Sequence, residues 1–267
     1  MTLSSKFYKV EDSEAAQELF HSRGWTDGLP IVPPTPQFVQ ACLDEAKLPA
    51  EHLIGIEPVR GRFIPAEKLA VNAVMAGCLP IHFPAVVASI SAMLQQPFLL
   101  HGAIASTSGC AVLMIFNGPI REELDMSSTF SVLGGSGNRA LTVIGRAVRL
   151  TLYNLLDFRP GMADRSTIGH PGKISYCLAE DEENTPWDSL SVERGLPKKA
   201  SAVTVMAAMA PRQIMNEWTN VPEEILDTFI GEMKVNMRLY SIYPGNYVII
   251  VPPQFRAHFE SAGWSKK

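Results

Sequence analysis

Residues 111–119 read AVLMIFNGP, a short apolar run that ends in asparagine, glycine and proline. A short apolar run bounded by turn residues predicts a strand. Because the run does not alternate with polar residues, we expect the strand to be buried on both faces, as in a sheet covered by helices. Similar runs, which we also predict to be strands, occupy Lys173–Leu178, Ala202–Met206 and Tyr247–Val251.

An apolar run followed by proline and then by helix-compatible sequence occurs four times, in residues 29–34, 115–119, 207–211 and 249–253. Proline suits the first position of a helix because its missing N–H costs nothing there. We interpret the pattern as repeated strand-to-helix turns. In open α/β sheets ligands bind outside the carboxyl ends of the strands, so these turns are candidate sites by geometry.

Six longer segments have apolar residues at helical spacing or open near a proline. They are Ser13–Arg23, Pro36–Lys47, Pro65–Cys78, Pro84–Gln95, Ala140–Leu156 and Pro222–Met237. Together with the strands they predict an α/β fold with a mixed or parallel sheet covered by helices. We expect a single domain of residues 1–267, with a division into two lobes near residue 160 left open.

The 267 residues are 46% hydrophobic and 19% charged, which is a globular composition. A net charge of −4 gives no chain-wide basic field, so nucleic acid and membranes are not expected as partners. No apolar stretch reaches the roughly 18 residues of a membrane-spanning helix, and no signal peptide is recognised. The cysteines lie far apart without a CxxC motif, so we expect free thiols and a cytoplasmic location.

The first candidate site is the glycine-rich segment 133–139 and the helix that it opens. Glycines allow a ligand to approach the backbone, and a helix N-terminus offers free N–H groups to an anion. The helix is apolar apart from one polar stripe, and a buried arginine needs a carboxylate or phosphate partner. The alternative is that the stripe, which includes Arg149, pairs with structural acids in residues 122–125. The candidate substrate-binding residues here are Gly135, Ser136, Asn138, Arg139 and Arg146.

The second candidate site is residues 105–110, ASTSGC, directly before the apolar run. Cys110 is a candidate nucleophile if a cation or a histidine stabilises its thiolate. Asn117, at the far end of the run, is a candidate substrate contact. The alternative is that Cys110 is buried and inert, as most cysteines are.

The third candidate site is residues 165–173, RSTIGHPGK. His170 lies between two glycines and beside a proline, so it is a candidate acid or base with a pKa near neutrality. Lys173 could hold an anion, and Cys177 in the following run is a second candidate nucleophile if it is exposed. The alternative is a solvated loop followed by an acidic turn.

The fourth candidate site is residues 24–30, GWTDGLP, in which Trp25 offers a large flat contact and Asp27 could face the substrate. The alternative is a structural turn anchored by the tryptophan. The six histidines form no HxH, HExxH or Cys/His motif, so no metal site is predicted. The sequence identifies no cofactor.

Five segments together resemble a bacterial family associated with thioredoxin-like domains that carry a UGSC or CGSC motif. They are GWTDGLPIVPPT (24–35), NAVMAGCLPIHFP (72–84), FNGPIREEL (116–124), GNRALTVIGRAVRL (137–150) and STIGHPGKISYCLAEDEENTPWDSLSVERG (166–195). The chain is similar to the part of that family without the UGSC motif. The resemblance implies a redox-associated or small-molecule enzyme component, and a separate thioredoxin-like subunit as a partner.

These observations favour a cytoplasmic enzyme, or enzyme subunit, that acts on a small anionic substrate. The reaction would be that of a lyase, a hydrolase or a redox-associated enzyme, and we expect a homo-oligomer. His170 would transfer protons, Asp27 would orient it or the substrate, and Arg139 with Arg146 would bind the anion. If there is one active site, His170, Asp27, Asn138 and Arg139 should lie within roughly 10 Å of one another. The alternative is a non-catalytic scaffold that presents substrate to a separate thioredoxin-like domain.

Overall fold

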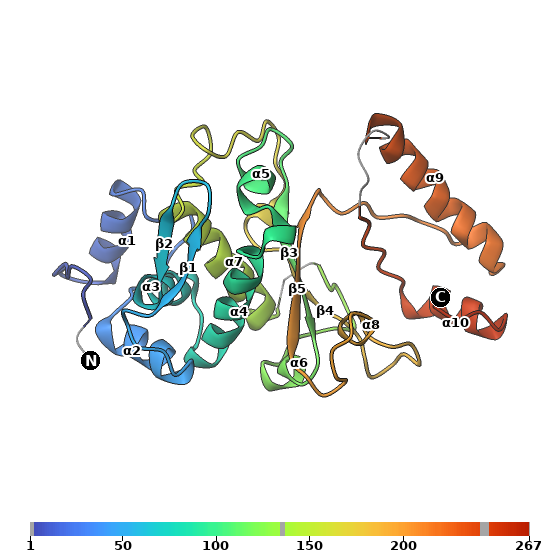
Figure 1. Cartoon of the computed structure of the whole chain (residues 1–267), viewed down its shortest axis with the longest axis horizontal. Coiled ribbons are helices and arrows are strands. Elements are labelled where there is room, and N and C mark those ends of the chain that lie inside the picture. The colour runs from blue at the N-terminus through green and yellow to red at the C-terminus, as the bar shows by residue number, and fades with distance from the viewer. Residues whose placement is uncertain (1–2, 134–136, 241–245, 267) are drawn as a thin grey trace. The chain divides into compact units, whose positions relative to one another are not determined.

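The structure, a computed structural model, describes residues 3–133, 137–240 and 246–266, with the backbone alone described for 236–240. Its contacts divide the chain into two compact units (Figure 1). The first comprises Met1–Asp181 and Ser189–Ala210, and the second comprises Glu182–Asp188 and Pro211–Lys267. Residue 160, where the sequence left a lobe division open, lies inside the first unit.

The first unit is built on a three-stranded mixed sheet. The strand order is β4 (Cys177–Ala179), β3 (Ala111–Asn117) and β5 (Ala202–Ala208). β3 pairs in parallel with β4 and antiparallel with β5, so that Ala111 lies opposite Ala208. All seven residues of β3 are buried. The α/β class with a mixed sheet is therefore confirmed, as is burial of the apolar run on both faces.

Five helices of this unit follow the predicted segments closely. Asp12 caps the first of them by accepting a hydrogen bond from the backbone N–H of Ala15. Gly77 ends the third at a φ of 95°, a left-handed conformation that glycine adopts without strain. The helices are α1 (Ser13–Ser22), α2 (Pro36–Glu45), α3 (Ala66–Ala76), α4 (Phe83–Met93) and α7 (Arg139–Asn154).

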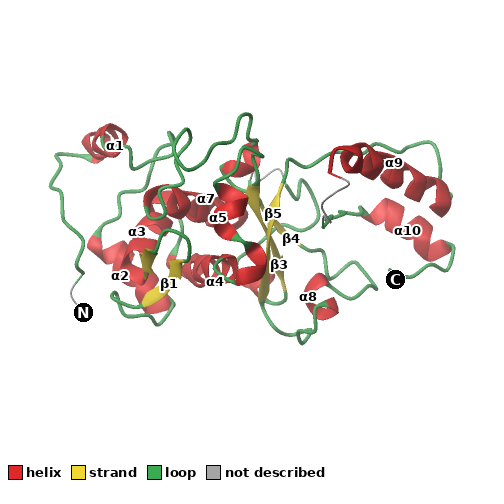
Figure 2. Cartoon of the chain, turned by 45° about the horizontal axis from the view of Figure 1, so that its top comes forward, coloured by secondary structure: helices red, strands yellow, loops and turns green. Residues whose placement is uncertain are grey.

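The two faces of the sheet have different covers. On one face Val112, Met114 and Phe116 pack into the main core with residues of α3, α4 and α7 (Figure 2). The alternate residues of β3 belong to a smaller cluster. Leu133 packs against this cluster, and so does Leu190 of the short helix α8 (Leu190–Glu193). The period of two along β3 thus divides the core into a large helical layer and a thin opposite layer.

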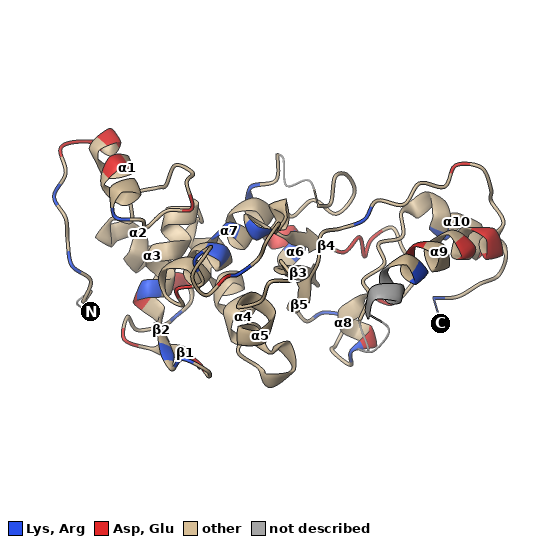
Figure 3. Cartoon of the chain, turned by 90° about the horizontal axis from the view of Figure 1, so that it is seen from above, with Lys and Arg blue, Asp and Glu red and all other residues tan. Residues whose placement is uncertain are grey.

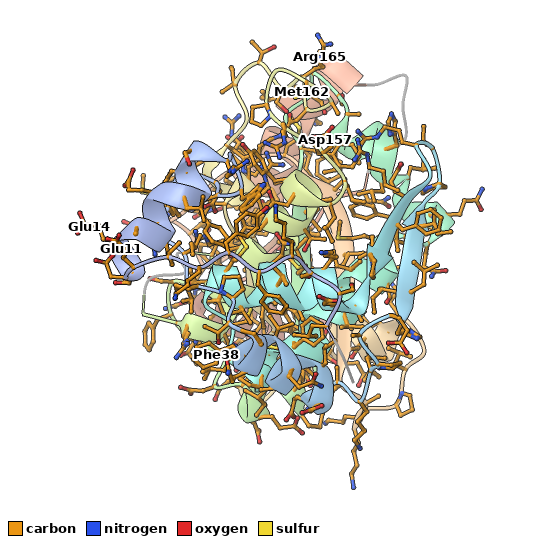
Figure 4. All side chains as sticks on the ribbon, turned by 90° about the vertical axis from the view of Figure 1, so that its left-hand side faces the viewer. Glu11, Glu14, Phe38, Asp157, Met162 and Arg165 are labelled. Carbon is orange, nitrogen blue, oxygen red and sulfur yellow. The ribbon has the colours of Figure 1, made fainter. Side chains whose placement is uncertain are left out.

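The remaining elements of the first unit are short. A hairpin of β1 (Leu53–Glu57) and β2 (Arg62–Pro65) was not predicted, because neither segment is a continuous apolar run. Phe38 of α2 is 52% exposed at the outer surface (Figure 4). The other elements are η1 (Pro80–His82), η2 (Gln96–Phe98), α5 (Leu100–Ile104), α6 (Ile120–Glu123) and η3 (Pro171–Lys173).

The predicted strand Lys173–Leu178 begins too early. Pro171–Lys173 instead form the turn η3. His170 caps this turn, because its Nδ1 accepts a hydrogen bond from the backbone N–H of Gly172. The strand is limited to Cys177–Ala179. The polar start of the predicted segment belongs to the loop, and its apolar end belongs to the sheet.

The strand–proline–helix pattern is correct at one of its four places, where β3 leads through Pro119 into α6. Residues 29–34 form no strand before α2, since three prolines there remove the N–H groups that a strand needs. No helix follows β5 until Pro222. Tyr247–Val251 are not a strand either, although α10 follows them as expected. Apolar character alone does not distinguish a strand from an extended loop.

In the described part of the second unit the helices are α9 (Pro222–Tyr240) and α10 (Pro253–Ser261). Its buried core is small and consists of Ile225, Phe229 and Phe259, with Trp187 and Phe255 packed against them. Exposed apolar side chains are frequent here, and Trp218 is 70% exposed.

In the described part of the chain no single helix is long and apolar enough to cross a membrane. Taken together, α3 and the segment Pro80–Met93 have the length and apolar composition of a membrane-spanning helix, but the pair is bent by 120°.

Candidate functional site

A small pocket lies in the first unit between α7 and the beginning of β3. Its space is enough for about one water molecule. One side is apolar and the other carries two cations, a thiol and a phenol ring. The lining residues are Ile104, Cys110, Ala111, Val112, Met114, Gly145, Val148, Arg149, Leu152, Gly172, Lys173 and Tyr176.

Two glycines bring the second and third candidate segments together beside this pocket. Gly109 has a φ of 80° and Gly169 a φ of 66°, both in the left-handed region. A Cβ on Gly109 would lie 3.2 Å from the backbone nitrogen of Gly169, so the two loops touch through their backbones. The segment before β3, which contains Cys110, is therefore adjacent to the loop that contains His170.

Cys110 is the half-exposed thiol of the chain, since Cys42, Cys78 and Cys177 are buried. Its Sγ lies 3.3 Å from Ser108 Oγ and 3.5 Å from Met209 Sδ. Burial raises the pKa of Cys177 to about 12, and Cys177 is 5% exposed. Cys177 therefore fails the exposure on which its role as a nucleophile depended, because a thiolate forms reluctantly in apolar surroundings.

Asp164 organises the charged side of the pocket, although it is only 2% exposed. Its Oδ2 accepts hydrogen bonds from Lys173 Nζ at 2.7 Å and from Arg149 Nη2 at 3.2 Å. Its Oδ1 accepts from the Ser166 hydroxyl at 2.6 Å, and that hydroxyl also accepts from Lys173 at 2.7 Å. Burial acts to raise the pKa of Asp164, but the hydrogen bonds from Lys173 and Ser166 outweigh it and lower the pKa.

The charges at this cluster do not cancel. Arg149 and Lys173 carry two positive charges. Among the described residues, the one carboxylate within 4 Å of either side chain is that of Asp164. One net positive charge therefore remains on a pocket wall. The side chains of Arg149 and Lys173 are 13% and 15% exposed, so solvent screens this charge less than it would at the surface.

His170 lies behind the pocket wall and not in it. Its ring contacts Tyr176 edge-on at 5.3 Å between centroids, and a Cβ on Gly172 would meet the ring at 2.6 Å. Nε2 lies 3.3 Å from the carbonyl oxygen of Ala208, and Nδ1 accepts from Gly172, which fits a neutral ring with hydrogen on Nε2. Burial lowers the pKa of His170, and the charge of Lys173 acts in the same direction, which favours this neutral form.

Two side chains fix the end of β5 against Cys110. His170 reaches the carbonyl of Ala208, and the Tyr176 hydroxyl donates to the carbonyl of Met209 at 3.1 Å. Met209 in turn contacts the Cys110 thiol. His170 and Tyr176 thus position the segment after β5 that contacts Cys110 at the pocket wall.

The fourth candidate segment does not reach the pocket. Asp27 accepts two hydrogen bonds from Arg146. Burial acts to raise the pKa of Asp27, but the bonds from Arg146 outweigh it and lower the pKa. Trp25 packs on the main core and stacks edge-on with Tyr8 and Phe20. The carboxylate that pairs with Arg146 is therefore Asp27, and not a ligand or an acid of residues 122–125.

The start of α7 is also separate from the pocket lining. Arg139 is exposed, and its Nη2 donates to the carbonyl of Gly77 at 2.9 Å. Asn138 is occupied as the helix cap, since its Oδ1 accepts from Leu141 and its Nδ2 donates to Asp125. Gly135 and Ser136 lie outside the described residues. The expected convergence of Asp27, Asn138 and Arg139 on one pocket with His170 is therefore not found.

The carboxyl end of β3, predicted to be a ligand site, is filled by side chains. Asn117 is fully buried, and its Nδ2 donates to Glu180 Oε2 at 2.7 Å. The same carboxylate oxygen accepts from the backbone N–H of Leu190. The pocket lies instead at the amino ends of the parallel strands β3 and β4, next to Cys110 and Tyr176.

Arginines along α7 thus have separate partners, and charge is confined to a few places in this helical layer (Figure 3). Arg149, which belongs to the polar stripe of this helix, has a carboxylate partner and also lines the pocket. Asp164 and Ser166 were missed as site residues. The signal that could have indicated them is the pair of hydroxyl residues just before His170. Ser166 belongs to this pair, and Asp164 lies two positions before Ser166.

Among the described residues no group of three histidine, cysteine, aspartate or glutamate side chains could hold a metal ion. No family model, no curated protein and no solved structure matches this chain.

Proposed function

We propose that the chain is an enzyme, or a subunit of one, that binds a small anionic substrate in the pocket between Cys110 and Lys173. The observation that carries this proposal is the net positive charge left by Arg149, Lys173 and Asp164 on the wall of that pocket. A cationic wall with a reactive side chain nearby is typical of sites for small anions. This position replaces the one expected around Arg139 and Arg146.

The two cations have hydrogen-bond donors to offer. Lys173 has three donors, of which Asp164 and Ser166 take two. Arg149 has five, and one is used on Asp164 among the described side chains. Because Asp164 holds both cations in place, an anion would meet donors that are already oriented, which reduces the entropy lost on binding.

Cys110 is the residue that we expect to react with the substrate. Its thiol lines the same pocket as Arg149 and Lys173, so an anion bound there would lie beside a nucleophilic side chain. His170 would take part in proton transfer only after the contact between its Nδ1 and Gly172 opens. In this proposal His170 first positions the end of β5, and acts as base in a later step.

The family resemblance supports the same class of function, since it also implies a small-molecule or redox-associated component. A cytoplasmic location and a homo-oligomeric state belong to the proposal as well. The reactions that fit a thiol and an anion-binding wall are those of lyases, hydrolases and redox-associated enzymes.

The proposal is tested by alkylation of Cys110. The native protein is treated with iodoacetamide, a neutral reagent, and labelling of each cysteine is followed by mass spectrometry with and without acetate or phosphate at constant ionic strength. We expect Cys110 to be labelled first, because the other three thiols are buried, and a bound anion to slow its labelling.

Variants locate the effect. Lys173→Met and Arg149→Met should each abolish the protection. Arg165→Met is the matched control, because Arg165 lies at the outer surface with its Nε bonded to the carbonyl of Met162 (Figure 4). It should leave the protection unchanged. Protection that persists undiminished in Lys173→Met, or the absence of protection by any anion, contradicts the proposal.

One observation favours the second candidate function, a non-catalytic subunit for a separate thioredoxin-like domain. The second unit exposes many apolar side chains, including Trp218, Tyr247 and Ile249. Patches of this kind are often contacts for another protein. Light scattering of the chain mixed with a purified CGSC-type domain tests this candidate, and a mass equal to that of the separate proteins would count against it.

A further inference from the structure

β5 leaves one edge of the three-stranded sheet unpaired. In an antiparallel pair, the backbone groups of alternate residues point towards the partner strand and those of the residues between point away. The N–H of Met114 donates towards β4, to the carbonyl of Tyr176, so the backbone groups of its β5 partner Val205 point away from β3. By the same alternation those of Val203 and Ala207 point away as well. Among the described residues, no hydrogen bond uses the backbone groups of these three residues.

This edge lacks the features by which proteins protect an edge strand, which are a charged residue, a proline or a bulge. β5 reads AVTVMAA, and its seven residues pair with β3 without a shift of register. The first six of these residues are partly exposed. The edge of β5 is therefore open to the addition of another strand, a common way in which proteins bind an extended segment.

The segment Tyr247–Val251 of the second unit is a strand-forming segment without a partner. Its sequence, YVIIV, is uncharged and consists of residue types that are enriched in strands. It is neither helical nor paired, and among the described residues its backbone forms no hydrogen bond. Its first four side chains are 39–51% exposed, so adjacent residues, which point to opposite faces of a strand, both leave apolar groups in water.

The segment and the edge are complementary in length, charge and apolar character. The free backbone groups of β5 span positions 203–207, which is the length of the five-residue segment. The sheet is apolar on both faces at this strand, since Val203 and Val205 pack on the main core and Met206 packs on the smaller cluster. Because the segment is apolar on both faces too, it fits such a sheet and would not fit one with a solvated face.

We propose that Tyr247–Val251 of one copy of the chain adds to the edge of β5 in a second copy, and that two copies exchange this segment reciprocally. Each copy has one free edge and one free segment, so a two-fold pair uses both and closes. A strand of five residues is smaller than the roughly 800 Å² per partner of a stable interface, and reciprocal exchange doubles the contact. This inference rests on the homo-oligomer of the proposed function and names its interface.

Amide hydrogen exchange, measured residue by residue on the full chain, tests the pairing. Exchange is compared at a concentration where light scattering gives the mass of two chains and after dilution to one where it gives the mass of one. We expect the amides of Val203, Val205 and Ala207 to exchange at least about tenfold more slowly in the dimer, because each then donates a hydrogen bond. The amides of Thr204 and Met206 point towards β3 in both states and serve as the internal reference.

Two variants address the two sides of the contact. Ile249→Lys should weaken the dimer by about tenfold or more, because the added charge would lose its water in the sheet. Ile230→Lys is the matched control, because Ile230 of α9 is 42% exposed and lies outside the segment. It should leave the dimer unchanged. Ala207→Pro removes an outward N–H and keeps the bonds to β3, so it should also weaken the dimer. Circular dichroism melts verify that each variant is folded.

The outcomes that overturn the inference are distinct. The mass of one chain at every concentration overturns it, and so does a dimer in which the three amides stay unprotected. Protection that persists in the monomer means that the strand comes from the same chain, and protection that needs a CGSC-type domain assigns the edge to that domain. Equal weakening by Ile249→Lys and Ile230→Lys means a general apolar contact. The anion site is tested separately, by the labelling of Cys110, so either proposal can fail alone.

Discussion

Arg146 of α7 and Asp27 lie 119 positions apart in the sequence and form a two-pronged ion pair. Nε donates to Oδ2 at 2.9 Å and Nη2 donates to Oδ1 at 2.8 Å. Both side chains are about nine-tenths buried. The pair anchors the loop before α2 to the central helix, so its role in this structure is to hold the fold.

The first prediction concerns this pair. Arg146→Met should lower the free energy of unfolding by about 3–5 kcal/mol, because it leaves the carboxylate of Asp27 buried without its partner. Asp27→Asn should cost a similar amount, and the double variant should cost less than the sum of the two. Urea unfolding of the three variants measures this coupling. Equal and additive losses would mean that the two residues do not interact.

The second prediction concerns acid stability and Glu67 of α3. Its carboxylate accepts hydrogen bonds from the backbone N–H groups of Ser4 and Ser5 and from the Ser4 hydroxyl. Burial would raise the pKa of Glu67, but these bonds lower it from 4.5 to about 2. A carboxyl whose pKa is lower in the folded state stabilises the fold above its unfolded pKa. This contribution should therefore be lost as the pH falls from 4.5 towards 2.

Glu67→Gln isolates this contribution. At neutral pH the variant should be less stable by on the order of 2 kcal/mol, since it loses hydrogen bonds to a charged acceptor. Below pH 2 the difference should vanish, because Glu67 is then protonated in the native protein as well. Urea unfolding at pH 7, 4 and 2 gives the comparison. A difference that does not change with pH would rule out the carboxylate as its source.

The third prediction concerns the backbone contact between Gly109 and Gly169. Gly109→Ala places a Cβ 3.2 Å from the nitrogen of Gly169 at a φ of 80°, so it should cost about 1–2 kcal/mol from the conformation alone. It should also separate the two loops and speed the alkylation of Cys110. Gly102→Ala is the matched control, because its Cβ would meet nothing within 4 Å and its φ is not positive. Similar melting temperatures for the two variants would contradict the contact.

The fourth prediction concerns Asp164. Asp164→Asn keeps the shape of the side chain and raises the net charge of the cluster from +1 to +2. The fold should lose on the order of 3 kcal/mol, because two buried cations lose their carboxylate. The more positive cluster should favour anions of higher charge, so that phosphate gains protection of Cys110 relative to acetate. An unchanged ratio between the two anions would mean that Asp164 does not set the charge of the site.

The sequence predicted the elements whose signal is local. β3 and α7 could be recognised because a buried strand and a buried helix are apolar over their own length. The hairpin β1–β2 and the loop at Tyr247–Val251 could not, because pairing depends on a partner strand and not on apolar character. In both cases apolar character did not indicate whether a partner strand lies alongside.

The same limit applies to the site. Cys110, His170 and Lys173 were recognised from their glycine-rich surroundings, and the structure brings their segments together. Arg146 was assigned to an anion because its acid partner, Asp27, lies far away in the sequence. Arg149 and Arg139 carry the same side chain on the same helix, and only the position of Asp164 distinguishes the one that lines the pocket.

The order of the strands has a consequence for how the chain is made. β3 emerges from the ribosome well before either of its neighbours, since Met114 pairs with Cys177 and Ala111 pairs with Ala208. Until then its uncharged, strand-forming residues have no edge to join, and such exposed segments bind to one another during slow folding. A nascent chain that ends before β5 should therefore need a chaperone, whereas one that extends past Ala208 can close its own sheet.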